Sequence, residues 1–409
     1  MTLHVPKKIV LFSHDSVGLG HVRRNLALAR AFTEAADRDG SGPVTGLLVT
    51  GEPVALKFPL PHGWEWLVIP GITKSGTSYG ARRLDVPFGD LTLLRGRIVH
   101  GALLSFAPDL VVVDRHPYGV RRELAPALRD LKRERPDTRI VLGMREVLDA
   151  PEHAAREWTK LDLGQLCLDF DQIWVYGDPS VHDPVASGEI PASISHLVRY
   201  TGYLSAGRAV GRAPRTLEQP YVVSMFGGGS DAFELAELAA RVSVPEGYEH
   251  LVVTGPQMPS ADFRRVQSAA GPRVQLRKSV PDGLACLREA SAAVLMGGYN
   301  TMCELLSSEV PALVVPRTAP RTEQLIRARA LERRGAVSVL EPDDVSSATM
   351  AAWFAAATAG ELDQGSGRAG IDGRGLAAAV GLAAALLAPD HAPAVSLRVT
   401  AMEAVADAC

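Results

Sequence analysis

Short runs of apolar, often β-branched residues alternate along the whole chain with segments whose apolar residues recur at helical spacing. This alternation predicts parallel sheets covered by helices. In the first half the expected strands are Lys8–Ser13, Gly46–Thr50, Trp66–Ile69, Leu110–Asp114, Ile140–Met144 and Ile173–Tyr176. In the second half they are Tyr221–Phe226, His250–Thr254, Val274–Arg277, Ala293–Met296, Ala312–Val315 and Val337–Leu340. Between strands of the first half we expect helices, notably over His21–Ala36 and Val120–Glu134.

The same order of elements starts again after a break, which predicts an α/β protein of two Rossmann-like domains. The segment Ser205–Pro220 is rich in Gly, Ala, Arg and Pro and has no apolar periodicity, which is typical of an interdomain linker. We therefore expect domains over 1–204 and 221–372, a linker over 205–220, and a helical segment over 373–409. Gly375–Ala388 is expected to be a packed helix because it is too short to span a membrane. Gly71–Arg97 is expected to be a polar flap.

The composition favours a globular α/β enzyme and argues against several other classes of protein. The chain has 409 residues, of which 46% are hydrophobic and 22% charged, as in a globular α/β enzyme. The formal net charge of −3 argues against a nucleic-acid partner. The four cysteines are far apart without a C-x-x-C motif, so neither a zinc site nor a disulfide framework is expected. With no signal-peptide pattern at the start, these features favour a cytoplasmic location.

A strand runs into the glycine turn SHDSVGLGH, which opens a helix. Gly18 and Gly20 let the backbone approach a ligand, and His21 falls in the first helical turn. The positive end of a helix keeps an imidazole neutral and able to accept a proton, so we expect His21 to be a general base. His14 is an acceptor-side candidate, with a structural role left open.

A second glycine turn follows the strand that ends at Phe226. Gly227, Gly228 and Gly229 are expected to bring backbone amides close to a diphosphate, and Ser230 adds a hydroxyl group. A plain tight turn is the alternative interpretation. The sequence is neither a Walker A loop nor a G-x-G-x-x-G motif.

The strongest motif is MGGYNTMCE, in which a strand ends in a glycine pair before a helix. Gly298, Asn300 and Thr301 mark the start of this helix, where free amides bind phosphate. Glu304 lies about one turn further and can accept both hydroxyls of a ribose. A solvated surface position is the alternative for Glu304.

Charged residues also follow three other expected strands. After Val315 come Arg317 and Arg321, which suit diphosphate oxygens, and Glu323 and Gln324, which suit sugar hydroxyls. In the first half, the carboxyl ends of two strands carry four further acceptor-side candidates: Asp114, His116, Arg145 and Glu146. For these, an interdomain ion pair is an equal alternative.

The run GGYNTMCELLSSEVPALVVPRTAPRTEQLIRARALERRGA resembles the donor-binding half of the MurG-type glycosyltransferases, and FGGGSDA resembles the glycine turn of that domain. In the first half only GLGH carries the resemblance. It implies a GT-B fold with two Rossmann-like domains facing a central cleft. It implies roles for Thr301 at phosphate, Glu304 at ribose, Glu323 and Gln324 at the donor sugar, the Val280 main chain at the base, and His21 as the family's loop histidine.

Together these features predict an inverting, metal-independent transfer from a nucleoside-diphosphate sugar to a hydroxyl acceptor, with the donor as co-substrate and no cofactor. The resemblance favours UDP, and dTDP and GDP stay open. A nucleotide-sugar 2-epimerase or hydrolase on the same fold is one alternative, and a non-catalytic nucleotide-sugar binder is another. The acceptor, the oligomeric state and peripheral contact with a membrane are left open.

Overall fold

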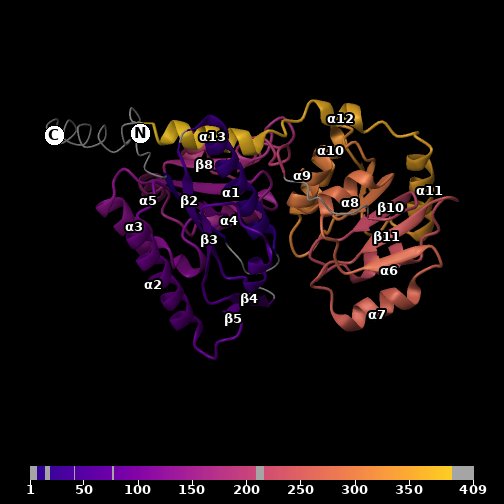
Figure 1. The fold of residues 1–409 in the computed structure, drawn as a ribbon, viewed down its shortest axis with the longest axis horizontal. Coiled ribbons are helices and arrows are strands. Elements are labelled where there is room, and N and C mark those ends of the chain that lie inside the picture. The colour runs from indigo at the N-terminus through magenta and orange to yellow at the C-terminus, as the bar shows by residue number, and fades with distance from the viewer. Residues whose placement is uncertain (1–6, 14–18, 41, 76–77, 209–215, 389–409) are drawn as a thin grey trace.

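A computed structural model describes residues 7–13, 19–40, 42–75, 78–208 and 216–388, and Figure 1 shows two lobes side by side. The N-terminal lobe holds a seven-stranded parallel sheet in the order β3-β2-β1-β6-β7-β8-β9. Its strands are β1 (Lys7–Phe12), β2 (Val44–Thr50), β3 (Trp64–Val68), β6 (Leu110–Asp114), β7 (Arg139–Arg145), β8 (Gln172–Tyr176) and β9 (Val198–Tyr200). A hairpin of β4 (Ile72–Ser75) and β5 (Ser78–Ala81) lies outside it.

The central strands of this sheet are apolar except at their ends, because helices cover both faces. All five residues of β6 are buried. The helices are α1 (Gly20–Asp39), α2 (Phe88–Phe106), α3 (Ala125–Glu134), α4 (Pro151–Trp158) and α5 (Leu163–Asp169), with short 3₁₀ helices η1 (Pro53–Lys57), η2 (Val120–Arg122) and η3 (Ala192–Leu197).

The C-terminal lobe repeats the plan with a six-stranded parallel sheet in the order β12-β11-β10-β13-β14-β15. Its strands are β10 (Tyr221–Met225), β11 (Glu249–Val253), β12 (Val274–Arg277), β13 (Ala292–Leu295), β14 (Ala312–Val314) and β15 (Ser338–Val339). Its helices are α6 (Phe233–Ala240), α7 (Ser260–Ala269), α8 (Gly283–Glu289), α9 (Tyr299–Leu306), α10 (Glu323–Arg333), α11 (Ser347–Thr358) and α12 (Gly365–Ala369).

Both sheets reverse their strand order at one place, and these places locate the site. In the N-terminal lobe β1 pairs with β2 on one side and β6 on the other. In the C-terminal lobe β10 pairs likewise with β11 and β13. Open α/β sheets bind ligands at the carboxyl ends of the strands that flank such a reversal. The loops after β1, β6, β10 and β13 are therefore the expected binding loops.

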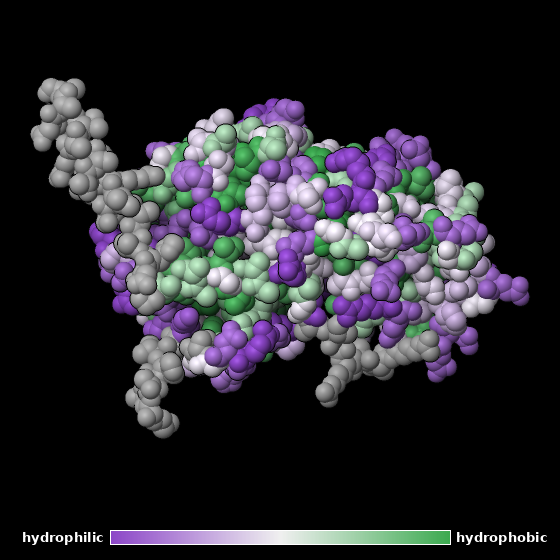
Figure 2. All heavy atoms as spheres, turned by 90° about the horizontal axis from the view of Figure 1, so that it is seen from above, coloured by the Kyte–Doolittle hydropathy of each residue, from purple (hydrophilic) through white to green (hydrophobic). Residues whose placement is uncertain are grey.

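The last described helix, α13 (Gly375–Leu386), returns to the N-terminal lobe and packs on α1 (Figure 1). Leu376, Ala379 and Ala383 are buried on its inner face, and the Leu386 carbonyl accepts a hydrogen bond from Arg139. Figure 2 shows apolar side chains gathered over the N-terminal lobe on this upper face. The expectation of a packed helix here is confirmed.

Every strand expected from the sequence is present, with its ends within two residues of the expected ones. Two expectations were wrong. Val120–Glu134 is not one helix, because Arg121 and Arg122 have φ of 50° and 63° within the short η2, and Glu123 and Leu124 lie between η2 and α3. Gly71–Arg97 is not a polar flap throughout, because it contains the β4–β5 hairpin and the first half of α2. The expected linker 205–220 is described only at its ends, since 209–215 lie outside the described residues.

Candidate active site

His21 and Asp114 meet where the N-terminal sheet reverses its strand order. Asp114 ends β6, and His21 is the second residue of α1, which follows β1. His21 Nδ1 lies 2.8 Å from Asp114 Oδ2. The Asp114 side chain is 1% exposed and that of His21 is 19% exposed. The pair is thus anchored in the protein at its carboxylate end and reaches solvent at its imidazole end.

The charges around this pair fix which nitrogen of His21 carries the proton. Burial lowers the pKa of His21, and the nearby Asp114 carboxylate opposes this shift only in part. Arg24 and His21 hold the pKa of Asp114 well below its usual range despite its burial. Arg24 also lies 3.0 Å from Nδ1 of His21. Because the ionised carboxylate at 2.8 Å can only accept, we assign the proton to Nδ1, which donates to Asp114, and Nε2 is the basic nitrogen.

Arg24 completes this cluster from the next turn of α1. One of its guanidinium nitrogens donates to both oxygens of Asp114 at 2.6 Å, and the side chain is 2% exposed. The guanidinium also lies 5.8 Å above the Tyr176 ring and 5.5 Å above the Tyr299 ring. Arg24 was not among the residues expected from the sequence. Its spacing of three residues from His21, which puts both on one helix face, was the signal available.

The start of α9, from the C-terminal lobe, lies directly against the start of α1. The Asn300 amide donates to the Gly20 carbonyl at 2.9 Å. Neither helix has a side-chain cap at its first turn. Gly298 precedes α9, and a Cβ atom added there would meet nothing within 4 Å. Free amides at a helix start bind anions. The anion-binding end of the motif MGGYNTMCE therefore faces the lobe that carries His21.

Glu304 lies on the same helix and is engaged across the interface. It accepts from Arg23 at 2.8 Å and lies 3.7 Å from Arg208, and its side chain is 4% exposed. Arg208 also donates to Asn300. The solvated position considered for Glu304 is therefore wrong, since the carboxylate is buried among arginines. Sequence reasoning missed Arg23 and Arg208, because neither belongs to a recognisable motif.

The glycine turn after β10 is built partly for the protein's own packing. A Cβ atom on Gly229 would lie 2.1 Å from the Thr254 carbonyl oxygen, and one on Gly228 would lie 2.8 Å from Gln257. Gly227 has φ 60° and open space around it, and Ser230 is exposed. Close contact with the backbone of the neighbouring loop explains Gly229, whereas Gly228 meets only the end of the Gln257 side chain and Gly227 faces open space.

Arg317 joins this turn to the start of α10. It donates to Asp231 at 2.9 Å and to Glu323 at 2.6 Å, and its backbone amide donates to the Gln324 side chain. The Glu323 side chain is 5% exposed. Arg317 is 26% exposed, so the guanidinium is held by two carboxylates and still reaches solvent. The structure therefore brings together the glycine turn after Phe226 and the charged segment after Val315.

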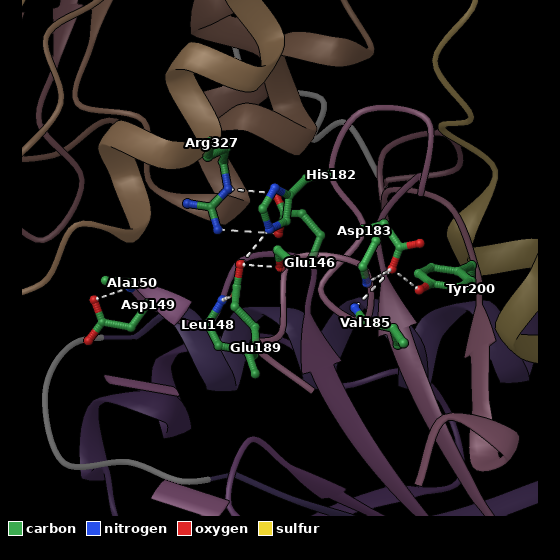
Figure 3. Close-up of polar contacts among 12 residues, drawn as sticks. Glu146, Leu148, Asp149, Ala150, His182, Asp183, Val185, Glu189, Tyr200 and Arg327 are labelled. Carbon is green, nitrogen blue, oxygen red and sulfur yellow. Dashed lines mark hydrogen bonds and ion pairs between the residues drawn. The ribbon is translucent and has the colours of Figure 1, made fainter. Parts of the chain in front are cut away.

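Glu146 and Arg327 form an ion pair between the lobes, at 2.6 and 3.2 Å, with both side chains fully buried (Figure 3). Arg327 also donates to the Gly297 carbonyl. Of the two interpretations of Glu146, the interdomain ion pair is therefore the one observed. Next to it, Asp149 accepts from the amide of Thr322. These contacts hold the start of α10 against the N-terminal lobe.

The remaining candidates lie around these groups. Arg321 pairs with Glu157 of the N-terminal lobe at 3.1 Å. Arg145 ends β7, and burial together with the charge of Arg327 lowers its pKa to about 10. His116, Val280 and Thr301 are half-buried. His14 and Gly18 lie outside the described residues.

The described residues hold neither a metal-ligand cluster nor a membrane-spanning helix. Among the residues that the structure describes, no group of three His, Cys, Asp or Glu side chains is arranged to hold a metal ion. Within the same residues no helix is both long and apolar enough to cross a membrane.

Comparisons with known proteins agree with this architecture. No protein-family model matches the chain. An uncharacterized glycosyltransferase of Methanosarcina mazei is 27% identical over 120 residues, which cover 29% of this chain and only 30% of that protein.

Solved structures match almost the whole chain at low identity. The glycosyltransferase VinC, in complex with dTDP, has a TM-score of 0.59 at 15% identity and covers 93% of this chain and 99% of its own. The calicheamicin glycosyltransferase CalG4 has a TM-score of 0.54 at 20% identity, covering 97% and 98%. MurG of Acinetobacter baumannii has a TM-score of 0.54 at 15% identity, covering 92% and 99%. The chain therefore has the GT-B fold of these glycosyltransferases, as its sequence predicted.

Proposed function

We propose that the protein is an inverting glycosyltransferase that uses a nucleoside-diphosphate sugar as donor. The observation that carries the proposal is the His21–Asp114 pair, placed opposite the uncapped start of α9. A base on one lobe and an anion-binding helix start on the other are the two parts that such a transfer requires. The likeness to glycosyltransferases of the same fold supports the class of reaction.

In the proposed mechanism Nε2 of His21 takes the proton of the acceptor hydroxyl as its oxygen attacks the anomeric carbon of the donor. The bond from the anomeric carbon to the diphosphate breaks on the opposite face, so the configuration inverts. Asp114 keeps the proton on Nδ1 and stabilises the imidazolium that forms.

The departing diphosphate gains negative charge, which the C-terminal lobe is built to stabilise. The amides at the start of α9, the turn at Gly227 and the Arg317 guanidinium are the proposed donors. Arg321 stays a further candidate, although in this structure it pairs with Glu157. No step in this scheme requires a metal ion, so chelators are expected to leave the rate unchanged.

Donor binding is proposed to exchange the contacts of Glu304. In the structure its carboxylate accepts from Arg23, whose side chain is 41% exposed. The ribose hydroxyls replace Arg23 in the proposed complex, and Arg23 is released to solvent. Glu323 and Gln324 are proposed to contact the donor sugar, and the main chain of Val280 the base.

The test is the release of nucleoside diphosphate from UDP-, dTDP- and GDP-sugars, with and without a panel of hydroxylated acceptors. We expect release that depends on an acceptor and a product whose anomeric configuration, read by NMR, is opposite to that of the donor. Release without acceptor would instead identify a hydrolase or epimerase. Retention of configuration would overturn the proposed single displacement.

A further inference from the structure

A cavity lies in the N-terminal lobe, lined by residues of α2, η2 and α3. Helices α2 and α3 lie on the side of this lobe away from the C-terminal lobe (Figure 1). The cavity has a volume of about 410 Å³ and runs between α2 and the segment formed by η2 and α3. We call it the α2–α3 cavity; the residues that matter here are Leu93, Arg97, Arg121, Arg122 and Pro126. Its volume lies in the range of small-molecule sites.

The positive charges that line the α2–α3 cavity are not paired with carboxylates of its own lining. Arg97, Arg121 and Arg122 are exposed, and none of them forms an ion pair with a carboxylate of the described residues. The two carboxylates that line the cavity already have cationic partners. Arg95 holds Glu123 through two hydrogen bonds of 2.7 and 2.8 Å, and Asp130 pairs with His100 and Arg133. Three arginines are therefore left to face an anion.

Two of these arginines are held in place by aromatic rings. The Arg121 guanidinium lies 5.2 Å above the Phe88 ring, and that of Arg122 lies 5.2 Å above the Tyr118 ring. A guanidinium stacked in this way keeps its N–H edge available, and less side-chain entropy is lost when it binds an oxyanion.

The backbone at these arginines is strained. Arg121 has φ 50° and Arg122 has φ 63°, a conformation that only glycine adopts freely. Two anchors hold it: Val120 packs with Ile72 and Leu91, and the next residue, Glu123, is bound by Arg95. Strain of this kind, maintained by its surroundings, gathers at ligand sites.

The wall of the cavity is apolar beside the charges. Leu93 is 54% exposed toward it, next to Pro126 and the small residues Gly89 and Gly96. A hydrated inorganic anion would leave this wall unused. We propose that the α2–α3 cavity binds a phosphorylated small molecule with an apolar portion, at a site separate from the proposed donor site.

Binding of phenyl phosphate, measured by isothermal titration calorimetry on the full chain, tests the proposal. Arg121→Gly removes the guanidinium and relieves the backbone, so the variant is expected to fold at least as well as the wild type. Arg97→Glu reverses a charge on an exposed helical position. Arg38→Gln is the matched control, because it removes an exposed charge elsewhere on the same lobe.

We expect phenyl phosphate to bind the wild type and Arg38→Gln equally, and to bind Arg121→Gly and Arg97→Glu at least about tenfold more weakly, which corresponds to one charged contact. Arg317→Ala, which alters the proposed donor site, should leave this binding unchanged. Loss in Arg317→Ala with none in Arg121→Gly would place the ligand between the lobes and overturn the proposal. If inorganic phosphate bound as tightly as phenyl phosphate, the inference that the ligand has an apolar portion would be wrong. Turnover of nucleotide-sugars is a separate readout, so the two proposals fail separately.

Discussion

Asp114 Oδ2 lies 2.8 Å from His21 Nδ1 although 93 residues separate the two in the sequence. The contact exists because β1 and β6 are neighbours at the place where the strand order reverses. The carboxylate is ionised and buried, and the imidazole is neutral and partly exposed. This arrangement supports the proposal that His21 acts as a base toward a substrate.

Replacing His21 by Ala is expected to lower kcat/KM by about 10²- to 10⁴-fold, the usual contribution of a general base. Nucleoside-diphosphate affinity should stay within about twofold, since the donor contacts lie on the other lobe. Initial rates and calorimetric binding measure the two effects. A variant with near wild-type rates would show that His21 is not the base.

Replacing Asp114 by Asn is expected to lower kcat by about 10⁴-fold, because the amide permits the wrong tautomer of His21. The same change leaves the buried Arg24 guanidinium without its counter-charge, which costs about 3–5 kcal/mol of stability. Chemical denaturation measures this cost. Adding Arg24→Met should restore stability without restoring the rate, whereas recovery of both would mean that Asp114 acts only on folding.

The pH profile of kcat/KM should fall on the acid side at a pH below 6.5. Burial lowers the pKa of His21 from its ordinary value of 6.5, and the base is lost only when the ring protonates. The Asp114 charge raises the pKa of His21, so Asp114→Asn should move this limb to still lower pH. A limb above pH 6.5, or an upward shift in the variant, would contradict the assignment.

For the buried Glu146–Arg327 pair, the losses of folding stability caused by the two single substitutions are expected not to add up in the double variant. Either Glu146→Leu or Arg327→Met alone leaves a buried charge unpaired and should cost about 3–5 kcal/mol, while the double variant should recover most of this loss. Denaturation midpoints measure the effect. The control is Arg329→Ala, whose ion pairs are exposed and whose removal should cost less than about 1 kcal/mol. Strictly additive costs at Glu146 and Arg327 would refute the coupling.

If donor binding replaces Arg23 at Glu304, substitutions of these two residues should have opposite effects on nucleoside-diphosphate affinity. Glu304→Gln should weaken nucleoside-diphosphate binding about tenfold, as expected for the loss of a charged hydrogen bond to ribose. Arg23→Gln should leave the affinity unchanged or improve it, because it removes a competitor for Glu304. Weaker binding in Arg23→Gln would show instead that this arginine contacts the donor.

The sequence predicted the twelve expected strands well because both sheets are parallel and most of these strands are buried apolar runs, as in β6 and β13. It did not predict α2, because three separate glycines and scattered polar residues interrupt the helical pattern of Phe88–Phe106. It placed His21 correctly in the first turn of a helix. It could not pair His21 with Asp114, since the order of strands within a sheet is not written in their apolar patterns.

The contacts between the lobes could not be predicted from the sequence either. Glu146 and Arg327 are 181 residues apart, and nothing in the local sequence of either residue indicates the other. The same holds for Arg23 and Glu304, which are 281 residues apart. Motifs indicate which loop ends carry chemistry, and the relative placement of two domains decides which of those side chains meet.

The most direct test of the account is the melting temperature of the protein with and without UDP, dTDP and GDP at saturating concentration. A ligand that binds only the folded chain stabilises it by mass action, by about 2.7 kcal/mol at a concentration of one hundred times Kd. The account predicts that at least one nucleoside diphosphate raises the melting temperature, and that Arg317→Ala reduces the shift. No shift with any of the three would contradict it.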